Sequence, residues 1–390
     1  MNLLYGWLWV LASVIGNAEF WVILVNRSHA LAVHHRRLKL MRRMHDLAVP
    51  GWPLLLLLWL TGTGPDSLLR GGGLWEQSLW TRRLVLFTSL WCSTLIMQTV
   101  VWQRRQKKQA RFGSPGQQFD VVAATGDVSV RGTPGLLARV WPGNEYCRLE
   151  CNIKRATVTP HRQRLQKPAA MLRILHLSDL HFIGTPGTAY YEFVVRTAMQ
   201  QQADLILFSG DLIDRPELLD AAVRTLQPLT SLAPCCFVLG NHDWRYDFEE
   251  VRRRLQASGW RSVAGSVEIF QLKDRHIAIG GSERPWMGAE PVLVANSLCD
   301  LTILLSHSPD QLPAAQRLGY DLMLAGHTHG GQVVLPVVGP VFSPSRYGVA
   351  LASGLFQGAP TTVHVSRGIG AKDPIRWNCT PELTVLEVQF

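Results

Sequence analysis

From Met171 onward the chain consists of short apolar runs that end abruptly in polar residues. Six such runs are LRILHLSDLHF, ADLILFSGDLID, CCFVLGNHDW, HIAIGGSE, LTILLSHSPD and YDLMLAGHTHGG. Apolar runs of this length, bounded by Gly, Asp and Asn, are typical of buried strands. Helix-like stretches separate several of them, at 189–201, 216–229 and 248–258. The alternation predicts an α/β fold with stacked sheets.

The later strands have a different pattern. QVVLP, TTVHVSRG and LTVLEVQF follow one another without intervening helix-like stretches. A purely doubly wound sheet needs a crossover helix between successive parallel strands. The C-terminal part therefore favours a layered sandwich over a doubly wound sheet.

The first 112 residues contain long apolar runs instead of short ones. The run 3–25 is long enough to cross a bilayer, and Asn17 and Glu19 are its main polar interruptions. The run 47–62 is shorter and holds two prolines, so it is a weaker span or a re-entrant segment. The run 84–102 has no charged residue. The pattern predicts about three transmembrane helices in residues 1–112.

Basic residues beside these runs predict the topology. Six Lys and Arg lie in 26–46 and five in 104–111, whereas the loop between the second and third runs has three. By the positive-inside rule both basic stretches are cytoplasmic. We therefore expect an N-terminus outside, a multi-pass segment in the inner (cytoplasmic) membrane, and a cytoplasmic body. A cleaved signal peptide is the alternative, but MNLLYG lacks the basic residues that begin one.

Charge and composition then divide the chain. Residues 1–112 hold 14 Lys and Arg against 4 Asp and Glu, whereas residues 113–390 hold 25 of each. The net charge of +10 therefore belongs to the membrane segment, and we expect no nucleic-acid partner for the neutral body. The Gly- and Pro-rich residues 113–170 are predicted to be a linker with short strands that pack on the edge of the domain 171–390.

Polar residues that can bind metal follow five of the predicted strands. They are Asp179 and His181; Asp211; Asn241, His242 and Asp243; His307; and His327 and His329. Each group taken alone has an ordinary reading as a helix cap, a turn or a stabilised loop. Their joint occurrence at strand ends, where α/β proteins place their sites, favours a pair of metal ions. Carboxylate, amide and imidazole ligands suit manganese, iron or zinc.

The ordered set DxH, GD, GNHD, H and GHTH resembles the calcineurin-like metallophosphoesterase superfamily, from Leu172 to the C-terminus. The resemblance implies a four-layer αββα sandwich, here preceded by an N-terminal transmembrane segment. It also implies two divalent metal ions, with Mn²⁺ favoured and Fe or Zn as alternatives. By the same resemblance Asp179, His181 and His329 bind one ion; Asn241, His307 and His327 bind the other; and Asp211 bridges both. His242 would protonate the leaving oxygen or stabilise the pentavalent phosphorus, and Asp243 would orient its ring.

The C-terminal motifs indicate a branch of this superfamily. GHTHGGQVVLP, SPSRYG, VHVSRGIG and PIRWNCTPELTVLEV are similar to a branch whose members often carry N-terminal membrane segments. That branch includes the UDP-2,3-diacylglucosamine pyrophosphatases of the chlamydial type. The resemblance implies a lipid-linked substrate, cleaved to the lipid monophosphate and UMP in lipid A biosynthesis. Residues 280–284 read GGSER where many relatives have an acidic pair, so this loop departs from the pattern of the branch.

Three arginines are candidates for contacting a phosphate or diphosphate: Arg346, Arg367 and Arg376. Salt bridges on a solvated face are the alternative for each. Two other functions stay open: a general phosphodiesterase or phosphatase acting on a soluble substrate, and a non-catalytic membrane scaffold. The full set of ligands together with His242 argues against the scaffold, which would need none of them.

Overall fold

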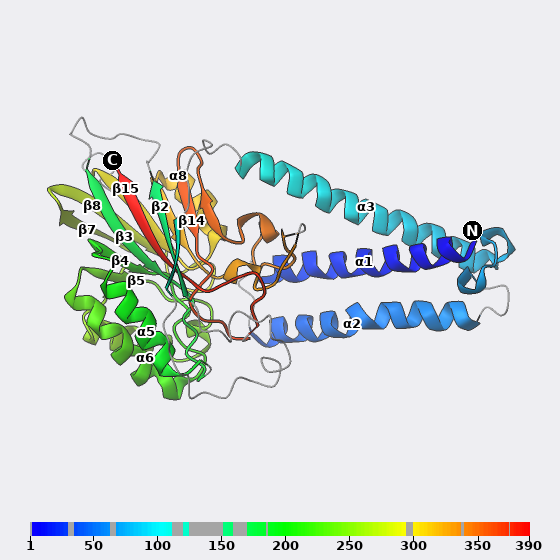
Figure 1. The fold of residues 1–390 in the computed structure, drawn as a ribbon, viewed down its shortest axis with the longest axis horizontal. Coiled ribbons are helices and arrows are strands. Elements are labelled where there is room, and N and C mark those ends of the chain that lie inside the picture. Colours follow the sequence, from blue (N-terminus) through cyan, green and yellow to red (C-terminus); the bar gives the residue numbers. More distant parts are fainter. Residues whose placement is uncertain are drawn as a thin grey trace. The chain divides into compact units, whose positions relative to one another are not determined.

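The computed structural model describes residues 2–29, 35–62, 68–110, 120–124, 151–158, 170–184, 186–293, 299–336, 339–373 and 375–390. The chain forms two compact units, Met1–Gln109 and Ala110–Phe390 (Figure 1). Most of the predicted linker, including residues 125–150 and 159–169, lies outside the described residues.

The N-terminal unit is helical. Its elements are α1 (Asn2–His29), α2 (His35–Gly62), α3 (Leu79–Ala110) and two short 3₁₀ turns, Leu68–Arg70 and Leu74–Glu76. One side chain from each long helix, namely Val10, Leu60 and Val85, contributes to a small buried cluster. Helices α1 and α3 approach closely at Gly16, where an added Cβ would overlap the Cβ of Cys92. The absence of a side chain at Gly16 allows this close packing.

Among the described residues, one helix is long and apolar enough to cross a membrane. It is α1, over the 22 residues Leu4–Val25 with a mean hydropathy of 1.9, and only 22% of that window is buried. A bilayer core requires about 20 apolar residues in a helix. Helix α2 begins with a basic stretch, so its apolar part is confined to 47–62. The structure therefore supports a single candidate anchor and does not support the expected three-span, multi-pass topology.

The C-terminal unit contains two large sheets in its described part. One has seven strands in the order β1-β2-β15-β3-β4-β5-β6, and the other has six in the order β13-β14-β10-β9-β8-β7. The first comprises β1 (Asp120–Ala124), β2 (Cys151–Val158), β15 (Glu382–Gln389), β3 (Met171–Leu177), β4 (Leu205–Phe208), β5 (Cys235–Phe237) and β6 (Arg261–Ser262). The second comprises β13 (Gly354–Phe356), β14 (Thr362–Val365), β10 (Leu322–Ala325), β9 (Leu301–Ser306), β8 (Arg275–Ser282) and β7 (Val267–Leu272).

Three buried clusters define the layers of this unit. One joins the first sheet to helices α5 (Thr188–Met199), α6 (Leu219–Leu226) and α7 (Phe248–Ala257). A second lies between the sheets, where Ile174 and Leu205 of the first meet Ile279 and Ile303 of the second. The third joins the outer face of the second sheet to α8 (Leu312–Leu318). Figure 1 shows α5 and α6 on one side of the sheets. The mixed α/β sheets agree with the fold expected for a metallophosphoesterase.

Most sequence-predicted elements occur where they were expected, with local differences. The predicted helix 216–229 is a 3₁₀ turn, the helix α6 and a second 3₁₀ turn, Gln227–Ser231. Pro228 lacks a backbone N–H, so the α-helix ends at Leu226. The predicted strand QVVLP is only the two-residue β11 (Val334–Leu335), paired with β12 (Gly339–Pro340) in a separate ribbon.

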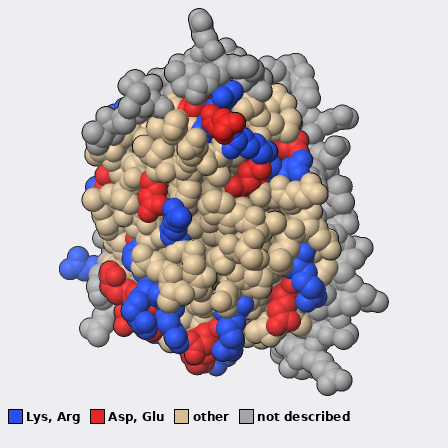
Figure 2. Space-filling model, turned by 90° about the vertical axis from the view of Figure 1, so that its left-hand side faces the viewer, with Lys and Arg blue, Asp and Glu red and all other residues tan. Residues whose placement is uncertain are grey.

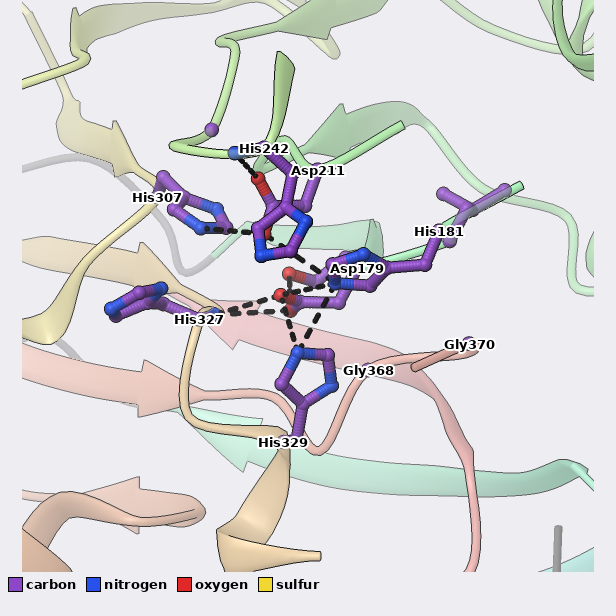
Figure 3. Close-up of polar contacts among 12 residues, drawn as sticks. Asp179, His181, Asp211, His242, His307, His327, His329, Gly368 and Gly370 are labelled. Atoms are coloured by element: carbon purple, nitrogen blue, oxygen red, sulfur yellow. Dashed lines mark hydrogen bonds and ion pairs between the residues drawn. The ribbon is translucent and has the colours of Figure 1, made fainter. Parts of the chain in front are cut away.

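The strand directions place the site. Strands β3, β4 and β5 run parallel in the first sheet, and β8, β9 and β10 run parallel in the second. The carboxyl ends of parallel strands meet at the same edge of a sheet. The loops that follow β3, β4, β5, β9 and β10 carry the predicted metal ligands, and these loops converge in space (Figure 3).

The surface of this unit carries charges of both signs. In the face shown in Figure 2, Lys and Arg side chains lie interspersed with Asp and Glu around uncharged areas. Several described pairs are in direct contact, such as Lys273 with Asp204 at 2.6 Å and Arg253 with Glu250 at 2.6 Å. This mixture agrees with the equal numbers of acidic and basic residues counted in 113–390.

Candidate metal centre

The backbone of the site adopts an uncommon conformation at five of the predicted ligands. The φ angle is 52° at Asp179, 49° at His181, 57° at Asp211, 72° at His327 and 50° at His329. Residues with a Cβ rarely adopt positive φ, and such positions are typically held in place by their surroundings at functional sites. The strained loops turn the side chains back toward the sheet edge, where the ligand atoms meet.

Asp179, His181 and His329 form the first ligand group. Their ligand atoms lie within 4.8 Å of one another, and Asp179 and His181 are fully buried (Figure 3). The Nε2 atoms of the two histidines are 3.1 Å apart, and Asp179 Oδ1 is 3.8 Å from His181 Nε2 and 3.6 Å from His329 Nε2. Nδ1 of His181 contacts Asp214 Oδ2 at 2.6 Å, which leaves Nε2 directed at the group. Two nitrogens and a carboxylate oxygen therefore converge on one point.

Asp211 connects this group to the second. Its Oδ2 atom lies 3.4 Å from His181 Nε2 and 3.3 Å from His307 Nε2. Its Oδ1 atom accepts a hydrogen bond from the backbone N–H of His242 at 2.8 Å. One carboxylate thus faces both groups, which is the arrangement that a bridging ligand requires.

His307 and His327 form the second group with Asp211, again with ligand atoms within 4.8 Å. Nδ1 of His307 donates to the carbonyl of Ser209 at 2.8 Å, so its Nε2 faces the group. That Nε2 atom is 3.1 Å from Oδ1 of Asn241. The structure brings together the sets that the sequence predicted to share an ion, and their atoms fit a cation. The ligand atoms are carboxylate and amide oxygens together with imidazole nitrogens, and in His181 and His307 the opposite ring nitrogen is already hydrogen-bonded.

Neighbouring charges alter the pKa values of these histidines. Burial alone would lower the pKa of His181, but hydrogen bonds to Asp179 and Asp214 outweigh it and raise the pKa to about 10. Burial also lowers the pKa of His307, but the negative charge of Asp211 outweighs it and raises the pKa to about 9. Burial dominates at His329 and lowers its pKa to about 3. The carboxylates therefore favour positive charge at the centre of the site, and a metal cation competes with protons for the same place.

Two glycines allow the carboxylates to approach the backbone. A Cβ added at Gly326 would overlap Ser178 Oγ and the Asp179 carboxylate, and one added at Gly240 would overlap Oδ1 of Asp211. The backbone N–H of His327 next to Gly326 donates to both oxygens of Asp179, at 3.1 and 3.0 Å. Glycine is therefore required where each carboxylate lies against a neighbouring loop.

The ring of His242 is held by a residue that the sequence prediction missed. Its Nδ1 atom makes a short contact with Oδ1 of Asp214, whose Oδ2 binds His181. The prediction that Asp243 orients this ring is wrong. The Asp243 carboxylate instead accepts backbone N–H groups of Asp211, Leu212, Ile213 and Gly240, at 2.9, 2.9, 3.2 and 2.9 Å. Asp243 ties two ligand-bearing loops together, and the motif GDLID was the available signal for Asp214.

The three candidate arginines have different surroundings. Arg376 is fully buried, and its Nη2 donates to the carbonyls of Arg367 and Gly370 at 2.8 and 2.7 Å, so it joins loops and does not face solvent. Arg367 lies with Nε 3.7 Å from the buried Glu382 and 3.4 Å from Ser353 Oγ. Arg346 is exposed, and its guanidinium lies 5.8 Å from the ring of Tyr347. Only Arg346 and Arg367 keep an exposed part that could reach a substrate.

Further residues approach the ligands without a sequence signal. The Trp286 ring lies edge-on to His307 and His327, with centroid distances of 5.5 and 5.0 Å. Nη1 of Arg245 is 3.3 Å from Nδ1 of His242. In the loop GGSER, Glu283 is buried and binds the backbone N–H of Leu239 at 2.6 Å. Glu283 therefore supports the loop after β5, whereas Trp286 from the same region contacts two of the ligand rings.

Comparison with known proteins gives a consistent result. Residues 172–331 match the model of the calcineurin-like phosphoesterase family. The chain is 31% identical over 228 residues to phosphodiesterase YaeI of Escherichia coli, in an alignment covering 56% of this chain and 83% of that protein. It is 30% identical over 226 residues to the metallophosphoesterase YkuE of Bacillus subtilis, with 56% and 79% covered. A bovine transmembrane protein with a metallophosphoesterase domain is 29% identical over 264 residues, with 60% and 56% covered.

Proposed function

The chain belongs to the calcineurin-like phosphoesterase family, a family of metal-dependent phosphoester hydrolases that use two metal ions, and we propose that it is a phosphodiesterase. The observation that carries this proposal is the position of Asp211. Its Oδ2 atom lies 3.4 Å from a histidine of one ligand group and 3.3 Å from a histidine of the other. A carboxylate between two such groups suits a pair of ions that share one ligand.

The proposed ligand sets follow the two groups. Asp179, His181 and His329 would hold one ion, Asn241, His307 and His327 would hold the other, and Asp211 would bind both. When bound, the ions supply Lewis-acid polarisation of the phosphoryl oxygens. Mn²⁺ is the ion we propose first, with Fe and Zn as the alternatives that the same nitrogen and oxygen donors accept.

His242 is the proposed proton donor to the leaving oxygen. Its Nδ1 atom is bound to Asp214, so Nε2 is the nitrogen that can transfer a proton. Asp214 holds this ring in position through Oδ1, and its other oxygen, Oδ2, fixes the ligand His181. Asp243 supports the backbone of both loops and takes no part in proton transfer in this proposal.

The substrate we propose is a phosphodiester or diphosphodiester at a membrane surface. The name of the relative YaeI, a phosphodiesterase, supports the diester class. The candidate anchor α1 supports a substrate that is itself in the membrane. The more specific substrate is UDP-2,3-diacylglucosamine, which would be cleaved to the lipid monophosphate and UMP by a catalytic unit on the cytoplasmic side. Arg346 and Arg367 would contact its phosphates.

One assay tests these proposals together. The full chain, purified in detergent and loaded with Mn²⁺, is assayed with bis-p-nitrophenyl phosphate and with UDP-2,3-diacylglucosamine. We expect both to be hydrolysed, and the Asp211→Ala variant to be inactive on both. Hydrolysis of the generic diester alone would exclude the lipid substrate and keep the phosphodiesterase. Equal, measurable activity of wild type and Asp211→Ala would exclude the proposed metal centre, whereas a lack of activity in the wild type would favour a scaffold.

A further inference from the structure

Two buried histidines from opposite sheets meet beneath the metal centre. His176 lies on β3 and His364 on β14, with exposed fractions of 0% and 2%. Their Nδ1 atoms are 3.0 Å apart, and the rings are nearly perpendicular at 80°. Side chains two positions apart on a strand share a face, so His176 lies on the same face as Ile174, within the core between the sheets. An otherwise apolar layer thus contains two imidazoles.

A continuous path of hydrogen bonds leads from this pair to the ligand Asp179. Nε2 of His176 is 2.9 Å from Ser209 Oγ, and Ser209 Oγ is 2.8 Å from Ser178 Oγ. Ser178 Oγ in turn donates a short hydrogen bond to Oδ2 of Asp179. Both serines are fully buried. Only Oδ2 of the carboxylate is involved, whereas Oδ1 faces His181 and His329.

The path continues in the other direction to a partly exposed arginine. Nε2 of His364 lies 3.6 Å from Oε1 of Glu382, a carboxylate with no exposed surface. The second oxygen of Glu382 is 3.7 Å from Nε of Arg367, whose side chain is 28% exposed. Glu382 lies on the inter-sheet face of β15 together with Thr384, whose hydroxyl donates to Oε1 of Glu382 at 3.2 Å. The path therefore crosses the sandwich from Asp179 to Arg367.

The number of available hydrogens gives the path a direction. Each serine has one hydroxyl hydrogen; Ser178 donates to Asp179, and Ser209 donates to Ser178. The contact between Ser209 and His176 then requires the hydrogen on Nε2 of His176. Burial, and then the charge of His364, hold the pKa of His176 well below its usual value, so this ring is neutral and accepts at Nδ1. His364 must donate to it, so every hydrogen bond from His364 onward points toward Asp179.

We propose that His176 and His364 are positioning residues for the metal ligand Asp179, acting through Ser209 and Ser178. The path holds Oδ2 away from the ions and keeps Oδ1 directed at them. Two imidazoles and a carboxylate lose their hydration in this core, a cost that an apolar pair of similar volume would avoid. Packing alone therefore does not account for them. The proposal rests on the metal centre proposed above.

Loss of the hydrogen-bond path should lower the affinity for the ion bound by Asp179 and leave the affinity for the other ion unchanged. Groups that orient a metal ligand typically contribute about 10–100-fold in metal affinity. Mn²⁺ should bind in two steps, one of which uses Asp179 as a ligand. The variant Asp179→Asn should abolish that step and so identify it. We expect Ser209→Ala and His176→Leu to weaken that same step by about 10–100-fold, and to leave the other step close to its wild-type value.

Stepwise Mn²⁺ binding to the full chain, measured by equilibrium dialysis, tests this without relying on activity. Conservative variants keep a donor in place: Ser209→Thr retains the hydroxyl, and His176→Gln supplies an N–H close to the position of Nε2. Both should bind Mn²⁺ nearly as wild type does. Thr302→Val is the matched control, because Thr302 makes a buried hydrogen bond to Asp321 at 2.7 Å away from this path. Thermal unfolding of each variant reports any general loss of stability.

The outcomes separate this proposal from the function it rests on. A wild-type chain that does not bind two Mn²⁺ ions would contradict the proposed function. Two bound ions in wild type, with both steps unchanged in Ser209→Ala, would overturn the role of the path. Equal weakening of both steps, or the same loss in Thr302→Val, would also overturn it, because the effect would then be structural. If His176→Leu does not fold, Ser209→Ala decides, since it removes a single oxygen.

Discussion

The two units of this chain depart from the usual distribution of residues in opposite ways. In the helical unit, large apolar side chains face outward: Leu58 is 69% exposed, Phe87 66% and Leu90 71%. In the catalytic unit, Asp179 and His307 have no exposed surface and Asp211 only 1%. Exposed apolar surface is unfavourable in water, and buried charge is unfavourable in a protein core. The first departure fits a unit with a candidate membrane anchor, and the second fits the cations that we propose for the metal centre.

The comparison indicates where to look for function in this molecule. The ordinary parts, such as the Leu and Ile layer between the sheets, need no further partner. The departures from ordinary burial lie in the helical unit, which includes the candidate anchor α1, and in and beneath the candidate metal centre. Substitutions of the exposed apolar side chains or of the buried carboxylates, and removal of the metal ions, should therefore have the strongest effects.

The largest effect is expected from neutralising the bridging carboxylate. Asp211→Asn should lower kcat on bis-p-nitrophenyl phosphate by roughly 10³-fold, because metal ions supply several kcal/mol of transition-state stabilisation and about 1.4 kcal/mol is tenfold in rate. Steady-state kinetics with Mn²⁺ measure it. Asp220→Asn is the control, since Asp220 lies on the surface in an ion pair with Arg254. Similar rates for both variants would contradict the need for a cation at the buried carboxylates.

The equivalent change in the helical unit places a charge on the exposed face of α1. Ile15 is 45% exposed near the middle of the candidate span. Ile15→Arg should cost about 2.5–3.5 kcal/mol of membrane insertion, which is about 100-fold in partitioning, whereas Ile15→Leu should have little effect. Flotation of the purified chain with liposomes measures the bound fraction. Equal flotation of all three proteins would show that α1 is not the anchor.

A smaller and more specific difference is expected between two neighbouring carboxylates. Asp214→Asn should lower kcat by about 10–100-fold, since it loosens the ring of His242 and the ligand His181. Asp243→Asn should act mainly on folding, because its carboxylate accepts four backbone N–H groups. Kinetics and thermal unfolding of both variants separate the two effects. A larger kcat effect in Asp243→Asn than in Asp214→Asn, at equal stability, would reverse the roles assigned to them.

The smallest effect concerns stability. Mn²⁺ at about 100 times its dissociation constant should stabilise the folded state by about 2.7 kcal/mol. For a unit of this size that corresponds to a rise in Tm of about 5–10 °C, and a chelator should reverse it. Differential scanning calorimetry of wild type and Asp211→Asn makes the comparison. A Tm that does not depend on Mn²⁺ in wild type would mean that the buried carboxylates are balanced without a cation.

The sequence predicted the strands that precede the site, β3, β4, β5, β9 and β10, and the residues at their ends. Both follow from local patterns, because an apolar run ending in Asp, His or Asn records the boundary between core and site. The partner of His242 could not be predicted in the same way. GNHD suggested Asp243, which is adjacent in the chain, whereas Asp214 is 28 residues away and reaches the ring through the folded loop.

Two other expectations are not supported by the residues that the structure describes. Arg376 had the same charge as the other two substrate candidates, but its burial against loop carbonyls depends on how the C-terminal segment folds back. The three apolar runs predicted three spans by composition. Helix α2, however, joins its basic and apolar halves into one continuous helix, so its apolar part is short. Charge and hydropathy are properties of a segment, whereas the environment of a side chain depends on its neighbours in space.

The sequence by itself determined the α/β pattern, the neutral catalytic body and the set of residues able to bind metal. Strand periodicity and residue chemistry act within a few positions of the chain, so they can be read without a fold. The tertiary structure alone decided that Asp214 holds two histidines and that His176 meets His364, 188 residues away in the chain. Such contacts arise only when parallel strands bring distant loops to one edge and two sheets close over one core.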